Sequence, residues 1–344
     1  MRVGLVYHPI YLQHDTGQHV ENAQRLYETM KLLEDCGLKE QLSMLTPEPA
    51  SIDDLLTNHE QSYITRVERK AAAGGGWLDA DTVLSPRSYE AALYAAGGAI
   101  KATEAVLTGA VDAAFALVRP PGHHATRDEA MGFCLFNNVA IAARRALSRQ
   151  GIDRILIADF DVHHGNGTQE SFYDDPRILY FSTHQSPLYP GTGRVEETGT
   201  GQGQGTNVNV PLPPSAGDNE YVSVFEELLV PLAHRFQPQI ILVSAGYDVH
   251  WADYISSQQM TITGFASLVA ILKQLATDLC QQRLAFALEG GYHLQALPYS
   301  IKATLDVLLG NSGTDDPLGP PARGRGGTDV SLLIKQVKAV HGLG

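Results

Sequence analysis

Short apolar runs alternate along the chain with longer segments in which apolar residues recur at helical spacing. Several runs are apolar at successive positions, as is typical of strands that are buried on both faces of a sheet. The runs predict strands at residues 3–7, 113–118, 154–161, 178–184, 206–212, 240–248 and 284–292. The helical spacing predicts helices at residues 20–35, 88–108, 137–149, 219–235, 262–281 and 293–309.

The alternation of strands and helices predicts an α/β fold with one large, mainly parallel central sheet and helices on both faces. No linker divides the sequence, so we expect a single domain over residues 1–344. The one low-complexity stretch, at residues 310–327, is rich in glycine and proline and predicts a loose connection to a C-terminal helix.

Polar residues gather at the ends of the predicted strands. In open parallel sheets, ligands bind at the carboxyl ends of the strands. Chemically rich segments end or follow five of the apolar runs, and these segments read RPPGHH, ADFDVHHGNG, FSTH, SAGYDVHWAD and LEGGYH. We therefore expect one functional site along this edge of the sheet.

The segment ADFDVHHGNG suggests a metal site. Asp159, Asp161 and His163 stand at i, i+2 and i+4, so in an extended chain they share one face. Buried carboxylates are costly unless they are paired or hold a metal. We predict Asp161 and His163 as ligands of a divalent metal, with Asp248 as the third ligand. Capped turn carboxylates are the alternative, but they do not explain the shared face. Asp159 is interpreted as orienting a neighbouring histidine or as holding a buried monovalent cation.

Two further segments suggest acid–base chemistry. His123 and His124 follow two prolines and a glycine, and they form either an acid–base pair or a second metal pair. Consecutive side chains diverge, which favours the acid–base interpretation, with histidine as the general base. Tyr292 follows two glycines and could donate a hydrogen bond to a developing oxyanion. By itself it would be an ordinary core or turn tyrosine, but it belongs to the same edge of the sheet.

Composition narrows the class of protein. Hydrophobic residues make up 44% of the 344, which is enough for a sizeable core, and the 25 basic and 38 acidic residues give a net charge of −13. This balance argues against nucleic-acid binding and suits cationic substrates. Three widely spaced cysteines fit a reduced compartment, and we expect neither a signal peptide nor a membrane span. We therefore expect a cytoplasmic protein.

Together these residues resemble the zinc-dependent histone deacetylase superfamily, which includes bacterial class II-like histone deacetylase-like amidohydrolases and acetylpolyamine amidohydrolases. The resemblance covers roughly residues 1–310, in order, through the motifs HVENAQRL, LVRPPGHHATRDEAMGFCLFNNVAIAA, DFDVHHGNGTQESFYDDP, YPGTG, NVPLPP, SAGYDVH and LEGGY. It implies an arginase-like α/β fold and zinc-dependent hydrolysis of an N-acyl amide.

The resemblance also assigns roles residue by residue. It implies zinc ligands at Asp161, His163 and Asp248. It implies a structural potassium site, partly through backbone oxygens, at Asp159, Asp161, His163 and Ser182. It implies that the acyl-lysine tunnel is formed by Gly132, Phe133, Tyr189 and Gly291.

The catalytic residues implied by the resemblance are His123, His124, Asp159, Asn166 and Tyr292. His124 falls on the general base, and Tyr292 falls on the tyrosine that polarises the acyl carbonyl. Some family members carry aspartate where this chain has Asn166, the partner of the second histidine. Asparagine supplies a hydrogen bond without a negative charge, so we expect His124 to be less readily protonated, which suits a base.

Two other functions remain as alternatives. An arginase-type enzyme with two manganese ions would need the order D-x-H-x-D on the strand, whereas this chain has D-x-D-x-H. A non-catalytic acyl-binding scaffold would have no need of the complete set of ligands, base and tyrosine.

The substrate is open between acetyl-lysine in a protein or peptide and an acetylpolyamine or other small acyl amide. Specificity is expected to depend on the loops at residues 9–19, 72–86 and 185–205, which could also pair two copies into a homo-oligomer. Four acidic residues could act as a gate for a cationic substrate, and these are Asp15, Asp81, Glu129 and Asp253. Each of them is more typical of ordinary solvated surface.

Overall fold

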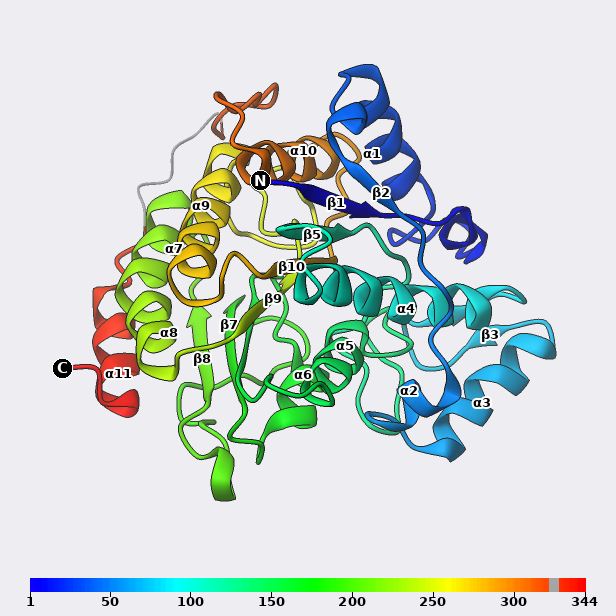
Figure 1. The fold of residues 1–344 in the computed structure, drawn as a ribbon, viewed down its shortest axis with the longest axis horizontal. Coiled ribbons are helices and arrows are strands. Elements are labelled where there is room, and N and C mark those ends of the chain that lie inside the picture. Colours follow the sequence, from blue (N-terminus) through cyan, green and yellow to red (C-terminus); the bar gives the residue numbers. More distant parts are fainter. Residues whose placement is uncertain (322–327) are drawn as a thin grey trace.

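The computed structural model describes residues 1–321 and 328–344. Within these residues, eight strands form a central sheet in the order β2-β1-β5-β10-β9-β6-β7-β8, and every neighbouring pair is parallel (Figure 1). The strands are β1 (Val3–Val6), β2 (Ser43–Leu45), β5 (Ala113–Ala116), β6 (Ile155–Asp159), β7 (Ile178–Gln185), β8 (Asn207–Leu212), β9 (Ile240–Ala245) and β10 (Leu284–Leu288). The predicted single α/β domain with a parallel sheet is therefore confirmed.

Each predicted apolar run forms a strand, although most strands end two to four residues before the predicted limit. They end early because the polar residues at their carboxyl ends turn out of the sheet and into the site. The structure adds β2, whose residues are mostly exposed, and a small antiparallel hairpin of β3 (Gly76–Trp77) and β4 (Val83–Leu84).

Helices cover both faces of the sheet. The long helices are α1 (Gln24–Asp35), α3 (Gln61–Ala72), α4 (Ser88–Leu107), α5 (Asn138–Leu147), α9 (Ile262–Leu279), α10 (Ala296–Leu309) and α11 (Ser331–His341). The shorter ones are α2 (Ile52–Leu56), α6 (Asn166–Phe172), α7 (Asp218–Val224) and α8 (Val230–Phe236), with a π-helical turn at Phe225–Leu229 between the last two. Helices α4 and α5 pack on one face, and α1, α9 and α10 lie over the other (Figure 1).

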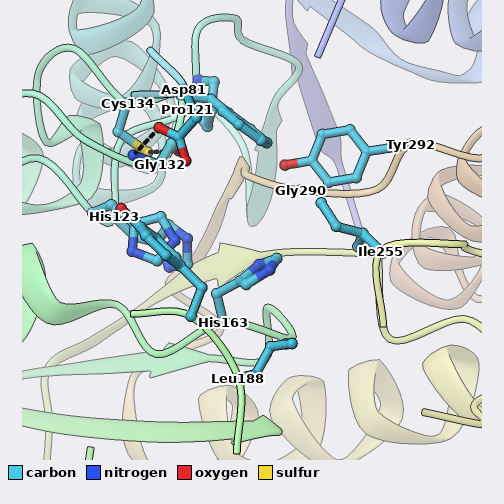
Figure 2. Close-up of a pocket in the computed structure, with 13 residues that line it drawn as sticks. Asp81, Pro121, His123, Gly132, Cys134, His163, Leu188, Ile255, Gly290 and Tyr292 are labelled. Atoms are coloured by element: carbon cyan, nitrogen blue, oxygen red, sulfur yellow. Dashed lines mark hydrogen bonds between the residues drawn. The ribbon is translucent and has the colours of Figure 1, made fainter. Parts of the chain in front are cut away.

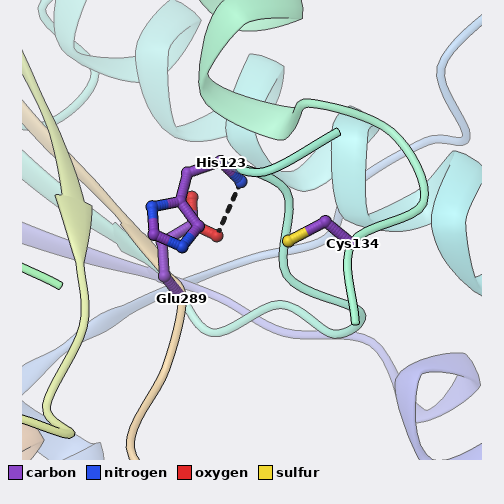
Figure 3. Close-up of side chains that lie close together, drawn as sticks. All are labelled: His123, Cys134 and Glu289. Atoms are coloured by element: carbon purple, nitrogen blue, oxygen red, sulfur yellow. Dashed lines mark hydrogen bonds between the residues drawn. The ribbon is translucent and has the colours of Figure 1, made fainter. Parts of the chain in front are cut away.

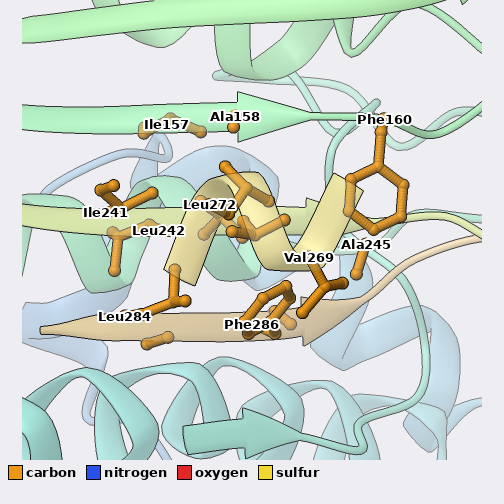
Figure 4. Close-up of a cluster of buried hydrophobic side chains, with 14 of the residues drawn as sticks. Ile157, Ala158, Phe160, Ile241, Leu242, Ala245, Val269, Leu272, Leu284 and Phe286 are labelled. Carbon is orange, nitrogen blue, oxygen red and sulfur yellow. The ribbon is translucent and has the colours of Figure 1, made fainter. Parts of the chain in front are cut away.

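The core lies where these helices meet the sheet. Val269 and Leu272 of α9 belong to one cluster with Ile241 of β9 and Phe286 of β10, all fully or almost fully buried (Figure 4). Burial on both faces explains why the central strands are continuous apolar runs.

Helix α9 departs from one expectation. Contrary to the expectation that no segment could span a membrane, α9 is long and apolar enough to do so by length and composition alone. Half of it is buried inside the fold, where it packs against β9, β10 and α10. A core helix of a folded protein meets the same criterion.

The C-terminal helix forms as predicted, as α11, and packs on β8. The expected loose connection at residues 310–327 falls outside the described residues at positions 322–327. The strands that carry the chemically rich segments, β5, β10, β9, β6 and β7, are direct neighbours in the sheet. Their carboxyl ends therefore converge on one place.

Candidate metal and acid–base site

A cavity of about 230 Å³ opens where these carboxyl ends converge. His123 and His163 line one side, and Tyr292 lies across from them with its hydroxyl pointing into the cavity (Figure 2). His124 is a further lining residue. Phe133 is a further part of the wall. The predicted acid–base residues and tyrosine therefore face a common space.

Of the three predicted metal ligands, His163 lines this cavity, and the two carboxylates lie beside it. Ligand atoms of Asp161, His163 and Asp248 all lie within 4.8 Å of one another, and all three residues are buried. Nδ1 of His163 is 3.1 Å from Oδ1 of Asp161 and 3.4 Å from Oδ2 of Asp248. Oδ2 of Asp248 has no hydrogen-bond partner among the described residues. An unsatisfied buried carboxylate oxygen beside a carboxylate and an imidazole fits a divalent cation.

Backbone contacts hold the two carboxylates in place. The N–H of Gly290 donates to Oδ2 of Asp161 (2.8 Å), and the N–H of Val162 donates to Oδ1 of Asp248 (3.0 Å). A Cβ atom on Gly246 would lie 2.1 Å from Oδ2 of Asp161, and one on Gly290 would lie 2.1 Å from Oδ2 of Asp248. The glycines in SAGYD and LEGGY therefore make room for the ligands.

The electrostatics of this group favour a bound cation. Burial, followed by repulsion from Asp161, raises the pKa of Asp248 to about 6. Burial lowers the pKa of His163, but the neighbouring carboxylates of Asp161 and Asp248 outweigh it and raise the pKa to about 9. Two adjacent buried carboxylates repel each other, and a divalent cation would remove that cost.

His123 is paired with Asp159, for which the sequence suggests a role in orienting a neighbouring histidine or holding a monovalent cation. Its Nδ1 lies 3.1 Å from Oδ2 of Asp159, which also accepts a hydrogen bond from the Tyr180 hydroxyl (3.0 Å). Burial lowers the pKa of His123, but the carboxylates of Asp161 and Asp159 outweigh it and raise the pKa to about 10. Asp159 therefore orients this ring. Ser182, named with Asp159 for the potassium site, is its direct partner in the β6–β7 pairing.

His124 is paired with Asn166, which begins α6, through a contact of 2.8 Å between Nδ1 and Oδ1. Burial and the neighbouring His123 and His163 hold the pKa of His124 well below its usual value. The direction agrees with the expectation for a base. The cause differs, because burial and the other histidines lower the pKa, whereas the bond to Asn166 raises it.

Tyr292 is buried, and Arg25 contacts both its ring and the residue before it. The guanidinium of Arg25 lies 4.9 Å from the centre of the Tyr292 ring, and Nε of Arg25 donates to the carbonyl of Gly291 (2.6 Å). Burial raises the pKa of Tyr292 well above its usual value, so its hydroxyl stays a donor. Of the two glycines before it, Gly290 lines the cavity. Gly291, the other predicted tunnel residue in this segment, is not among the lining residues, and its carbonyl accepts from Arg25.

The other predicted tunnel residues line the cavity. Phe133 lies edge-on to Tyr292 with 5.8 Å between ring centres, and Tyr189 lies edge-on to His124 at 5.2 Å. A Cβ atom on Gly132 would lie 2.3 Å from the His124 ring, so only glycine fits there.

The four acidic residues considered as a gate for a cationic substrate occupy different positions in the structure. Within the part of the chain that the structure describes, Asp81 is the one that lines the cavity, where its Oδ1 accepts from the N–H of Gly132 (3.2 Å). Asp253 is buried and accepts backbone hydrogen bonds. Asp15 and Glu129 lie away from the cavity lining.

Sequence reasoning missed a buried ionic cluster behind the tyrosine. Oε1 of Glu21 accepts from Arg119 Nε (2.6 Å) and Arg25 NH1 (3.0 Å), and the three side chains are completely buried. Arg119 could have been noticed, because it interrupts the apolar run before PPGHH.

A second group of side chains of the kinds that bind metals consists of His123, Cys134 and Glu289 (Figure 3). Oε2 of Glu289 already accepts from the backbone N–H groups of Gly122 (2.7 Å) and His123 (3.2 Å). Burial raises the pKa of the Cys134 thiol well above its usual value, so it stays protonated. This group therefore supports the PPGHH loop.

Comparison with known proteins places these residues in context. The histone deacetylase domain matches residues 19–308. A probable deacetylase of Archaeoglobus fulgidus is 44% identical over 319 residues, which cover 92% of this chain and 88% of that protein. A polyamine deacetylase of Homo sapiens is 39% identical over 341 residues, which cover 94% of this chain and 50% of that protein. The crystal structure of the HDA15 HD domain has a TM-score of 0.88 at 32% identity, covering 99% of this chain and 94% of that one.

Proposed function

Because the chain belongs to the histone deacetylase family of hydrolytic enzymes, we propose that it removes the acetyl group from acetyl-lysine in proteins or peptides with the help of zinc. The observation that carries the proposal is that a neutral histidine and a protonated tyrosine share one cavity with His163, a member of the carboxylate–imidazole ligand group. Family membership also removes the arginase-type alternative.

The family is zinc-dependent in general, and Asp161, His163 and Asp248 are the residues that would hold the ion here. Two carboxylates and one imidazole leave coordination positions free for substrate and water. A bound zinc ion would supply Lewis acidity and lower the pKa of a water molecule toward neutrality. A structural potassium ion near Asp159 and Ser182 is part of the same proposal.

The chain's own residues would handle protons and charge. His124 is neutral because of its low pKa, so it can accept the proton of the attacking water. The Tyr292 hydroxyl would donate a hydrogen bond to the oxyanion that develops on the acyl carbonyl. A protonated histidine of the His123–His124 pair would then return a proton to the leaving amine, which gives acetate and a free amine.

The cavity walls favour acetyl-lysine in a peptide over an acetylpolyamine. Phe133, Tyr189, Leu188 and Ile255 supply apolar surface that suits the four methylenes of a lysine side chain. A polyamine carries further ammonium groups that need partners inside the cavity. Among the described residues, Asp81 is the one acidic side chain in the lining, so the cavity offers a single carboxylate to several ammonium groups.

The deciding experiment compares amine release from an acetyl-lysine peptide and from an acetylpolyamine, with zinc-loaded protein and the Tyr292→Phe variant. Faster turnover of the peptide by the parent protein, lost in the variant, is the expected result. Preference for the polyamine would replace the substrate assignment, as the similarity to a human polyamine deacetylase allows. No turnover of either substrate by the parent would favour the non-catalytic scaffold.

A further inference from the structure

Asp253 joins the segment of the catalytic tyrosine to the segment of a metal ligand. It lies five residues after Asp248, and its carboxylate reaches the chain after β10. Its Oδ2 accepts from the backbone N–H groups of Tyr292 (2.6 Å) and His293 (3.0 Å). Its Oδ1 accepts from the N–H of Ile255 (3.2 Å), a residue of the cavity wall beside Tyr292 (Figure 2).

Because of these contacts, Asp253 does not act as a binding residue for a cationic substrate. Its side chain is only 4% exposed, and three N–H groups already converge on its two oxygens. A carboxylate that accepts several backbone N–H groups fixes the geometry of those peptide groups.

The tyrosine segment needs such a restraint. Tyr292 follows Gly290 and Gly291, and Gly291 adopts a φ of +112°, a conformation open mainly to glycine. Arg25 holds this segment through the carbonyls of Glu289 (2.5 Å) and Gly291 (2.6 Å). Asp253 is the side chain that holds the N–H groups of Tyr292 and the residue after it.

We propose that Asp253 is a positioning residue for Tyr292, whose hydroxyl it holds at the reacting carbonyl by fixing the backbone of residues 292 and 293. The inference rests on the proposed function, in which Tyr292 is the oxyanion donor. Asparagine at position 253 has one acceptor oxygen for three N–H groups, and its own NH₂ group would face at least one of them. Asp253→Asn should therefore loosen the tyrosine while keeping the volume of the side chain.

The test is a double-mutant cycle of Asp253→Asn and Tyr292→Phe with an acetyl-lysine peptide. Because a small misplacement of a catalytic group is costly, Asp253→Asn should lower kcat about 10-fold or more, with little change in KM or zinc content. In the Tyr292→Phe background the same substitution should lower kcat by less than about two-fold, since the residue acts through the hydroxyl. An equal loss in both backgrounds would show a general structural role and overturn the proposal.

Asp218→Asn is the matched control. Asp218 also accepts a backbone N–H, that of Thr261 at 2.8 Å, but it does so at the start of α9 and outside the cavity lining. The kcat of Asp218→Asn should equal that of the parent protein. If Asp253→Asn does not fold, Asp253→Glu keeps the carboxylate at a shifted position and replaces it in the cycle with the same expectations.

A second measurement does not depend on turnover. Hydrogen exchange of the backbone amides of Tyr292 and His293 should become about 10-fold faster or more in Asp253→Asn, while amides of β6 keep their rates. Unchanged exchange at residues 292 and 293 would overturn the proposal. Failure of the proposed function would differ from this, because the parent protein would then release no amine from any acetylated substrate.

Discussion

At the scale of single residues, the site depends on donors and acceptors whose protonation is set by burial. Tyr292 is 5% exposed, and its raised pKa keeps the hydroxyl protonated over the whole physiological range. His124 is neutral in the same range. A hydrogen-bond donor and a proton acceptor therefore line the same cavity.

The first prediction concerns the tyrosine hydroxyl. Tyr292→Phe removes one donor from the oxyanion while keeping the ring against Phe133 and Arg25. Loss of such a donor should lower kcat by about 10²–10³-fold with a small effect on KM. Steady-state kinetics with an acetyl-lysine peptide measure both constants. Tyr254→Phe, at a residue that is 65% exposed, is the control and should keep full activity. Equal activity of the two variants would exclude Tyr292 from the reaction.

Residues with local sequence signals could be predicted, and residues that act on distant backbone groups could not. Asp161 and His163 share a face of an extended segment, and the structure brings both to Asp248. Asp253 and Arg25 stabilise the tyrosine through peptide groups 39 and 266 positions away. No spacing along the chain reveals a contact of that kind.

At the scale of elements, the apolar runs predicted the central strands because burial on both faces leaves a continuous apolar signal. Helix α6 gave no such signal. It starts at Asn166 inside HHGNGTQESF, where glycine and polar residues favour a loop, and the contact of Asn166 with His124 fixes its first residue. Strand β2 is short and mostly exposed, so its pattern also lacked contrast.

The second prediction concerns the loop between β3 and β4, which holds a wall of the cavity. The Thr82 hydroxyl accepts from the N–H of Phe133 (3.1 Å), a residue with a strained φ of +69°. Thr82→Val keeps the shape but leaves this partly buried N–H without its partner, at a cost of about 1 kcal/mol. We expect Phe133 to shift and KM for the peptide to rise several-fold, with kcat changed less.

The measurement for Thr82→Val is the separation of kcat from KM. Thr277→Val is the control, because its hydroxyl only bonds back to Lys273 on the exposed face of α9. An unchanged KM in Thr82→Val would mean that the Phe133 wall is held by its packing alone.

At the scale of the whole molecule, the bound metal should contribute to stability. A ligand that binds only the folded state stabilises it by about 2.7 kcal/mol at a concentration of 100 times Kd. We predict that zinc raises Tm, that a chelator lowers it, and that Asp248→Asn, which removes one ligand, abolishes the difference. Calorimetry with and without chelator measures this. A parent Tm that does not respond to zinc would contradict the assignment of the ligand group.

The buried ionic cluster links distant parts of the chain and makes stability depend on pH. Glu21 lies before α1, Arg119 follows β5, and Arg25 reaches from α1 to the carbonyls after β10. Burial raises the pKa of Glu21, but Arg119 and Arg25 outweigh it and lower the pKa to about 2, below its ordinary value of 4.5. The charged form is therefore favoured in the folded state.

The sign of the pH effect follows from this lowered pKa. A carboxylate whose pKa is lower in the folded protein stabilises the fold at pH values above the pKa of the unfolded state. This contribution is lost as the pH falls from about 4.5 to about 2.

Glu21→Gln leaves two buried guanidinium groups without their partner, so it should destabilise the protein by about 3 kcal/mol or more near neutral pH. Urea unfolding from pH 3 to 7 measures this. The difference between parent and variant should shrink toward pH 3, whereas Glu60→Gln, at an exposed ion pair, should show almost no difference at any pH. A difference that stays constant over this range would show that Glu21 stabilises the fold by packing rather than by its charge.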